Sequence, residues 1–198
     1  SCDPINWESY RHRAHRFLSC WRFEDAAADF MIASRLNPND WNVFYHLGLS
    51  YFLLRDYAKA AKAYARCYGL TDADPGLIAV TDWYYMTLKR LGNDEEAAKI
   101  LARITDHMNP GENTAYYARL LMYKGLKKPE ELLSADPEEV TALELITMGF
   151  GIANYFLQNG QPDKAYDLME RVVKAGDEND CYFAFAYLAS KVDLAHKG

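Results

Sequence analysis

Two histidines three residues apart, His12 and His15, come nearest in this sequence to a metal-binding pair. On a helix, side chains with this spacing lie on one side, and two imidazoles so placed can bind a metal ion. A recognisable site needs further ligands, and no cysteine or carboxylate is spaced on the same stretch to supply them. We therefore interpret the two as surface or groove histidines and predict no metal site.

Carboxylates are plentiful, but their positions favour helix stability over acid–base catalysis. Most of them fall at expected helix starts or on second helices, where negative charge complements the helix dipole; they are Glu24, Asp25, Asp29, Asp94, Glu95, Glu96, Glu138 and Glu139. The chain contains no phosphate-binding glycine loop, nucleophile elbow or zinc-protease motif. Gly149 and Gly151 lie inside a helical pattern, so close helix packing explains them better than phosphate binding. We predict that the protein is not an enzyme and has no cofactor.

The charge balance argues against nucleic acid as a partner. The net charge is -6, whereas sequence-independent binding to nucleic acid needs a surplus of Lys and Arg. The basic cluster between Arg11 and Arg16 spreads around most of a helix, which is typical of a solvated face.

Cysteine spacing and hydropathy bear on the compartment. Cys2, Cys20, Cys67 and Cys181 are scattered, which favours buried thiols in a reducing compartment over a disulfide framework or a zinc site. No apolar run approaches the roughly 18 residues that a transmembrane helix needs, and no signal peptide is seen. A cytoplasmic protein is expected. The alternative is a periplasmic or membrane-anchored lipoprotein, because the opening around Cys2 resembles a lipidation site.

The chain repeats itself with an offset of 34 residues. The positions that match in size and character pair Ala14 with Gly48, Phe17 with Tyr51, Phe23 with Tyr57, Ala26 with Ala60, and Phe30 with Tyr64. At twice that offset, Gly92 pairs with Gly160 and Ala97 with Ala165. This return to one register predicts a stack of similar helix pairs that share a core.

The residues of the second unit follow a known pattern, Phe44-x2-Leu47-Gly48-x2-Tyr51 and then Ala60-x3-Tyr64. This sequence resembles the tetratricopeptide-repeat (TPR) family, with an aromatic residue in place of the family's first Trp. The resemblance implies an all-α, right-handed α-solenoid of about five helix-turn-helix repeats with a C-terminal capping helix. We expect a single domain over 1–198. Its repeats would span 7–40, 41–77, 78–110, an irregular 111–145, and 146–176, followed by a capping helix over 177–197.

Two irregular places are expected in this array. The extra residues of 69–76 predict a longer turn before the third repeat. In the fourth repeat, the second helix shrinks to about 129–134, and Asp136-Pro137-Glu138-Glu139 restarts a helix that runs as far as Gln158.

The resemblance also implies a binding surface, because such proteins bind peptides or partner helices on the concave face lined by the first helix of each repeat. Positions 2, 5, 9 and 12 usually point there, counted here from Trp7, Trp41, Ile78 and Gly111. The predicted contacts are Arg11, His15, Asn42, Tyr45, Leu49, Phe52, Asp82, Met86, Lys89, Arg119, Tyr123 and Asn154. Tyr45 is the expected anchor, because it holds the fifth position of the most regular repeat.

A related class of repeats grips the carboxylate terminus of chaperone peptides with basic and amide side chains. Two of the corresponding positions hold Ala79 and Trp83, which cannot do so, and this argues against such a clamp. The leading hypothesis is a scaffold or adaptor that binds a protein or peptide. The alternative is self-assembly into a homodimer through exposed aromatic side chains.

Overall fold

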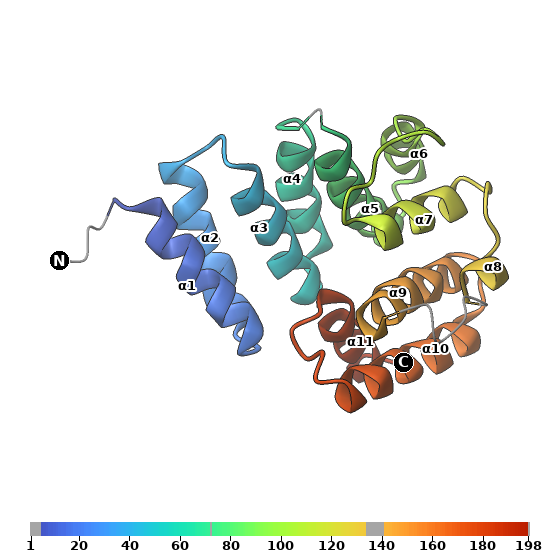
Figure 1. Cartoon of the computed structure of the whole chain (residues 1–198). Helices are drawn as coiled ribbons and strands as arrows, with labels where there is room; N and C mark the ends of the chain where they lie inside the picture. Colours follow the sequence, from blue (N-terminus) through green and yellow to red (C-terminus); the bar gives the residue numbers. More distant parts are fainter. Residues whose placement is uncertain (1–4, 72, 134–140, 198) are drawn as a thin grey trace. The chain divides into compact units, whose positions relative to one another are not determined.

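The computed structural model describes residues 5–71, 73–133 and 141–197 (Figure 1). These residues form eleven helices and contain no strand, so the all-α prediction is confirmed. The chain divides into two compact units, Ser1–Ala97 and Ala98–Gly198, and each is described by itself. The assignment of the whole chain to five repeats and a cap stays a prediction.

The first unit holds five complete helices, which are α1 (Trp7–Ser19), α2 (Phe23–Leu36), α3 (Trp41–Leu53), α4 (Tyr57–Tyr68) and α5 (Asp74–Arg90). Helix α6 (Asp94–Ala102) lies across the division. The second unit holds α7 (Thr114–Tyr123), α8 (Pro129–Leu133), α9 (Ala142–Gln158), α10 (Pro162–Glu178) and α11 (Phe185–Ala195). Pro38, Gly92, Pro110 and Gly160 all fall between helices.

Several helices begin at a side-chain cap. The Asp40 carboxylate accepts a hydrogen bond from the backbone N–H of Val43 at 2.8 Å, and Asp56 does the same for Lys59 at 3.1 Å. Each such cap satisfies a donor that the helix leaves unpaired and contributes about 1 kcal/mol. Capping therefore fixes where α3 and α4 start.

The helix pairs close through one repeated turn. Five regularly spaced turns each hold a residue with positive φ, namely Trp21, Arg55, Gly92, Gly125 and Gly160, and Asp180 between α10 and α11 also has positive φ. In all five, the next N–H donates to the carbonyl five residues earlier at 2.9 Å, as in a Schellman motif. Gly suits this left-handed conformation, whereas Trp21 and Arg55 adopt it against the strain on Cβ. The turn recurs at intervals of 33 to 37 residues, including between α7 and α8.

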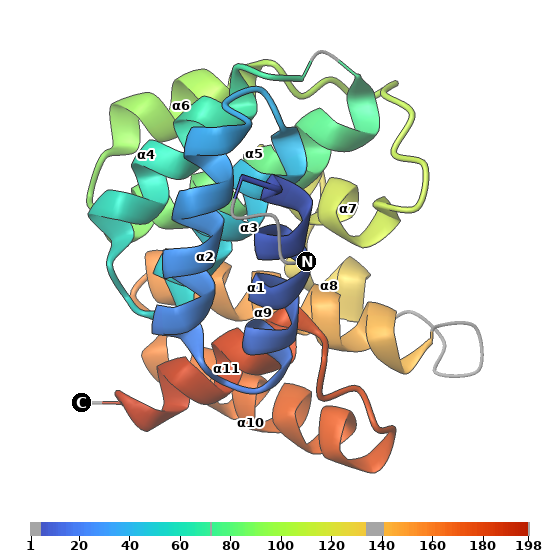
Figure 2. The same ribbon diagram turned by 90° about the vertical axis from the view of Figure 1, so that its left-hand side faces the viewer.

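The first unit packs each helix against the next, and both ribbon views show α1 beside α2 and α3 beside α4 (Figures 1 and 2). Gly48 allows α3 and α4 to approach closely, because a Cβ atom there would lie 2.6 Å from Cε1 of Tyr64. Gly48 therefore lies directly against α4, the helix that follows its own. Aromatic side chains continue this core, with the rings of Phe52 and Trp83 edge to face at 5.2 Å.

The second unit is built around α9, which packs on α7, α8, α10 and α11. Gly149 gives close approach to α10, since a Cβ atom there would lie 2.6 Å from Cγ2 of Val172. A Cβ atom on Gly151 would overlap the side chain of Arg119 on α7. The interpretation of these glycines as packing residues is confirmed.

Three helix starts differ from the expected boundaries. Helix α5 begins at Asp74, ahead of the expected repeat start at 78. Helix α9 begins at Ala142 rather than at Asp136, because Thr141 is extended and forms a capping box with Glu144; the predicted restart at 136–139 lies outside the described residues. The expected capping helix over 177–197 is also wrong at its start, since α10 continues to Glu178 and α11 begins only at Phe185.

Candidate functional site

The first unit brings together three of the predicted contact residues. Arg11 and His15 lie on α1 and Asn42 on α3, and all three are partly exposed. The side chain of His15 lies near that of Asn42, and the Arg11 guanidinium acts on His15 through its charge. The imidazole of His15 also lies against that of His46, with ring centroids 4.0 Å apart.

Both imidazoles of this cluster favour the neutral form. Burial, and next the charge of Arg11, lower the pKa of His15. Burial lowers the pKa of His46 to about 3, helped by His15. Nδ1 of His46 lies 2.8 Å from the carbonyl oxygen of Asn42, which can only accept, so Nδ1 carries the proton. The cationic group available to a ligand at neutral pH is therefore Arg11.

Most of the other predicted contacts in the first unit belong to the core. Tyr45 is 5 % exposed, and its ring stacks on Trp41 with centroids 4.8 Å apart. The remaining buried members are Leu49, Phe52, Asp82 and Met86. Lys89 is partly exposed and forms an ion pair with Asp94. Tyr45, the expected anchor, therefore has little exposed surface with which to contact a peptide.

The three predicted contacts in the second unit are tied to α9. Arg119 is fully buried, and its Nη1 donates to the carbonyl oxygen of Thr147 at 2.9 Å. The hydroxyl of Tyr123 donates to the carbonyl oxygen of Gly151 at 3.1 Å. Asn154 is buried, and its Nδ2 donates to Phe150 one turn earlier at 2.9 Å. Of the three, only Tyr123 is partly exposed.

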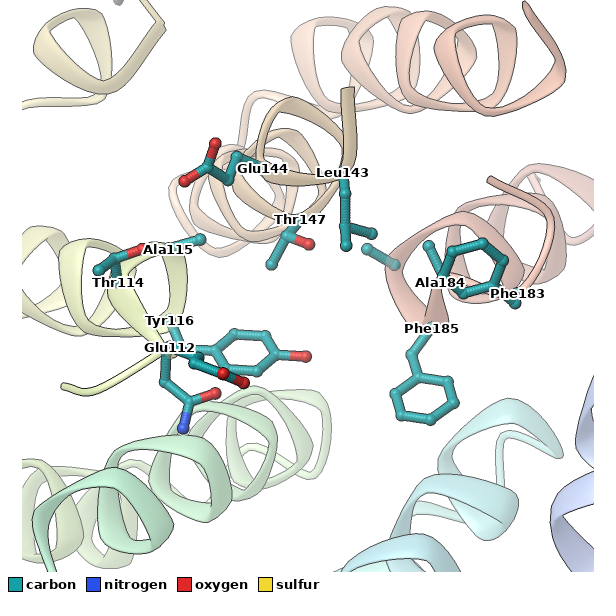
Figure 3. A pocket seen from close by; sticks show the side chains of 12 residues that line it. Glu112, Thr114, Ala115, Tyr116, Leu143, Glu144, Thr147, Phe183, Ala184 and Phe185 are labelled. Atoms are coloured by element: carbon teal, nitrogen blue, oxygen red, sulfur yellow. The ribbon is translucent and has the colours of Figure 1, made fainter. Parts of the chain in front are cut away.

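The second unit also contains a pocket of about 290 Å³, which we call the α7–α9–α11 pocket. It lies at the starts of these three helices, and Figure 3 shows Tyr116, Leu143, Thr147 and Phe185 around it. The lining is mainly apolar and aromatic, with two carboxylates, and consists of Glu112, Asn113, Thr114, Ala115, Tyr116, Leu143, Glu144, Thr147, Phe183, Ala184, Phe185 and Ala186. Leu143 is 42 % exposed and Phe183 is 60 % exposed, so a partner can reach both side chains.

Arg119 lies against two of the residues that line this pocket. Its guanidinium lies 5.3 Å from the ring centroid of Tyr116 and is hydrogen-bonded to the backbone of Thr147. Tyr116 and Thr147 both line the pocket. Arg119 was predicted as a contact, and the structure gives it a positioning role between α7 and α9.

The pocket residues were not among the predicted contacts, although a signal for some of them existed. Positions 2 and 5 counted from Gly111 are Glu112 and Ala115, and both line the pocket. The choice of Arg119 and Tyr123 from α7 followed positions farther along the helix, which face the neighbouring helix. Phe183 and Phe185 lay in a segment interpreted only as a cap.

Cysteine exposure and membrane-spanning length bear on the remaining predictions. Cys67 and Cys181 are buried thiols as expected, whereas Cys20 is exposed, since it follows α1 at a tight turn. Burial raises the pKa of Cys67. Within 5–71, 73–133 and 141–197, no helix combines the length and the apolar character required to cross a bilayer. Cys2, the candidate lipidation site, lies outside the described residues.

Comparison with known proteins identifies the repeated part of the first unit. Residues 14–77 match the family model described as tetratricopeptide repeat. No curated protein matches the chain. Among solved structures, the chain is similar to one described as YrrB, a TPR protein with an unusual peptide-binding site. The identity is 18 %, the match covers 92 % of this chain and 90 % of that one, and the TM-score is 0.46.

Proposed function

Since this chain carries tetratricopeptide repeats over residues 14–77, we propose that it is a scaffold that binds a protein or peptide partner. The observation that carries the proposal is the α7–α9–α11 pocket, an apolar hollow formed by the starts of three helices. Apolar pockets of this kind receive the anchor side chains that contribute most of the affinity of an interface. We place the principal contact of the second unit there.

The size of the pocket favours a side chain over a free small molecule. Pockets for drug-sized ligands range from about 300 to 1,000 Å³, and the volume of about 290 Å³ lies just below that range. The exposed Phe183 at its edge adds aromatic contact area, which is common at protein interfaces. A peptide that places one aromatic or aliphatic side chain between Tyr116 and Phe185 fits this geometry.

Selection from a random twelve-residue peptide library displayed on phage tests the proposal. The full chain is the bait, and Thr147→Trp, which fills the pocket, is the counter-bait. We expect enriched peptides that share an apolar anchor and bind wild type at least tenfold more tightly than Thr147→Trp, as for other truncated or blocked central anchors. Enriched peptides that bind Thr147→Trp as well as wild type would place the binding surface elsewhere.

A matched pair of leucines gives the control. Leu143 is 42 % exposed at the pocket, and Leu126 is 58 % exposed away from it. We expect Leu143→Ala to weaken a selected peptide several-fold in titration calorimetry and Leu126→Ala to leave the affinity unchanged. Both side chains are exposed, so neither substitution removes much of the core.

Arg11, His15 and Asn42 remain proposed contacts of the first unit, because they are partly exposed and lie together. Self-assembly into a homodimer stays an alternative, and sedimentation equilibrium distinguishes it, since a monomer at micromolar concentration favours the scaffold. The cytoplasmic location and the lipid anchor at Cys2 both stay predictions.

A further inference from the structure

We propose that the peptide held by the α7–α9–α11 pocket is cationic, with Lys or Arg on either side of its apolar anchor. This inference rests on the proposed function and adds the chemical class of the partner. It is carried by the charges at the pocket, which are negative among otherwise uncharged lining residues.

The pocket holds two charged side chains among its twelve lining residues, and both are carboxylates. Glu112 precedes α7, and Glu144 lies in the first turn of α9 (Figure 3). Glu112 is exposed and Glu144 is partly exposed, so both stand within reach of a partner's side chains. None of the twelve lining residues is Lys or Arg, and the Arg119 guanidinium next to Tyr116 is fully buried.

The charge of Glu144 is held in place. Its Oε2 accepts hydrogen bonds from the backbone N–H of Thr141 at 3.0 Å and from the Thr141 hydroxyl at 2.8 Å. These bonds, the backbone one first, lower the pKa of Glu144. The side chain therefore stays ionised at neutral pH and its position is fixed by the capping box. A fixed charge at the edge of an apolar pocket selects partners by charge.

The N-termini of the three helices favour a negatively charged partner, and this is the competing possibility. A helix N-terminus carries about half a positive charge. At α9 that charge is already met by Glu144, whereas the N-cap residues of α7 and α11, Asn113 and Ala184, make no side-chain cap. Of the full charges at the pocket, that of Arg119 is fully buried, whereas the carboxylates of Glu112 and Glu144 are open to a partner's side chains. The cationic partner is therefore favoured.

Three synthetic peptides test which sign of charge the pocket prefers in its partner. They share a central Trp-Leu anchor and differ at four flanking positions, which are all Lys, all Gln or all Glu. Fluorescence anisotropy with the full chain should show the Lys peptide binding about fivefold more tightly than the Gln peptide at low salt, and the Glu peptide binding most weakly. The preference should shrink at about 0.5 M salt, because exposed charges are then screened.

Two variants show whether the preference comes from the pocket. Glu112→Gln with Glu144→Gln removes both charges, and Gln at 144 keeps the reciprocal hydrogen bonds of the capping box. We expect this double variant to bind the Lys and Gln peptides alike. Glu130→Gln removes an exposed carboxylate of α8 outside the pocket and should leave the preference intact.

Several outcomes overturn the inference. A Glu peptide that binds as tightly as the Lys peptide would show that the helix starts dominate. A Lys preference that persists in the double variant would assign it to other carboxylates. If all three peptides bind alike and Thr147→Trp weakens all of them, the pocket stands as the binding site and the charge selectivity is wrong. If none of the three peptides binds, the inference fails, while the phage selection still decides the proposed function.

Discussion

The two units use the same turn between paired helices but fill their interiors differently. In the first unit, aromatic rings such as Tyr45, Phe52 and Trp83 occupy the space between first helices and are buried. In the second unit, a buried arginine crosses from α7 to α9, and small residues such as Ala115 and Ala184 line the pocket at the helix starts. A shared helix-pair scaffold thus gives a filled interior where its side chains are large and a pocket where several are small.

The largest expected effect is at Gly151. A Cβ atom there overlaps Arg119, which is fully buried and hydrogen-bonded to Thr147. We expect Gly151→Ala to lower the free energy of unfolding by about 3 kcal/mol, since a buried charged donor is displaced as well as crowded. Urea denaturation followed by circular dichroism measures it.

Gly69 supplies the control, because a Cβ atom there makes only ordinary contacts, the nearest at 3.6 Å. Gly69→Ala should change stability by less than about 0.5 kcal/mol. A Gly151→Ala variant as stable as Gly69→Ala would mean that Arg119 moves aside at little cost. It would then not hold Tyr116 and Thr147 in place.

The corresponding substitution in the first unit should cost less. Gly48→Leu crowds the ring of Tyr64, which is apolar where it meets α3, and overpacking of this kind typically costs about 2 kcal/mol. Lys62→Leu, on the exposed side of α4, should change stability little. If Gly48→Leu has the same melting temperature as wild type, the first unit is less tightly filled than its buried aromatic residues indicate.

The histidine pair makes the stability of the first unit depend on pH. His46 titrates at about 3 in the folded chain against 6.5 ordinarily, so below pH 6.5 the unfolded chain binds a proton that the folded chain refuses. The stability it contributes is complete above pH 6.5 and is lost as the pH falls toward 3. The loss approaches about 1.4 kcal/mol per pH unit.

His46→Phe removes this titration and keeps a ring of similar size. The stability of the variant relative to wild type should therefore rise by about 2 kcal/mol between pH 7 and pH 5, measured by urea denaturation at each pH. Parallel pH profiles for wild type and His46→Phe would indicate that the imidazole is solvated.

The sequence predicted features that depend on local spacing. The repeat offset, which pairs Gly92 with Gly160, predicts helix pairs, and the position of Gly149 and Gly151 inside a helical pattern predicts close packing. The pocket could not be predicted in this way, because its lining comes from three segments, 112–116, 143–147 and 183–186, that are far apart in the chain. Whether the side chains of neighbouring helices fill or leave the space between them depends on packing that periodicity does not specify.

The repeated turn shows a second limit, and it supplies the smallest expected effect. Glycine marks this turn at Gly92, Gly125 and Gly160, but Trp21 and Arg55 adopt the same left-handed conformation without being recognisable from residue type.

The left-handed conformation costs an L-residue about 1 kcal/mol or more because Cβ crowds the following carbonyl. Arg55→Gly should therefore stabilise the chain by about 1 kcal/mol, less the extra chain entropy that Gly gives the unfolded state. Gly92→Ala, the reverse change at an equivalent turn with no neighbouring atom within 4 Å of its Cβ position, should destabilise by a similar amount. Thermal unfolding of the two variants measures both changes in stability. If Arg55→Gly destabilises the chain, contacts of the Arg55 side chain, such as that with the Tyr57 ring at 5.9 Å, outweigh the backbone strain, and the turns at Arg55 and Gly92 differ in energy although they share a geometry.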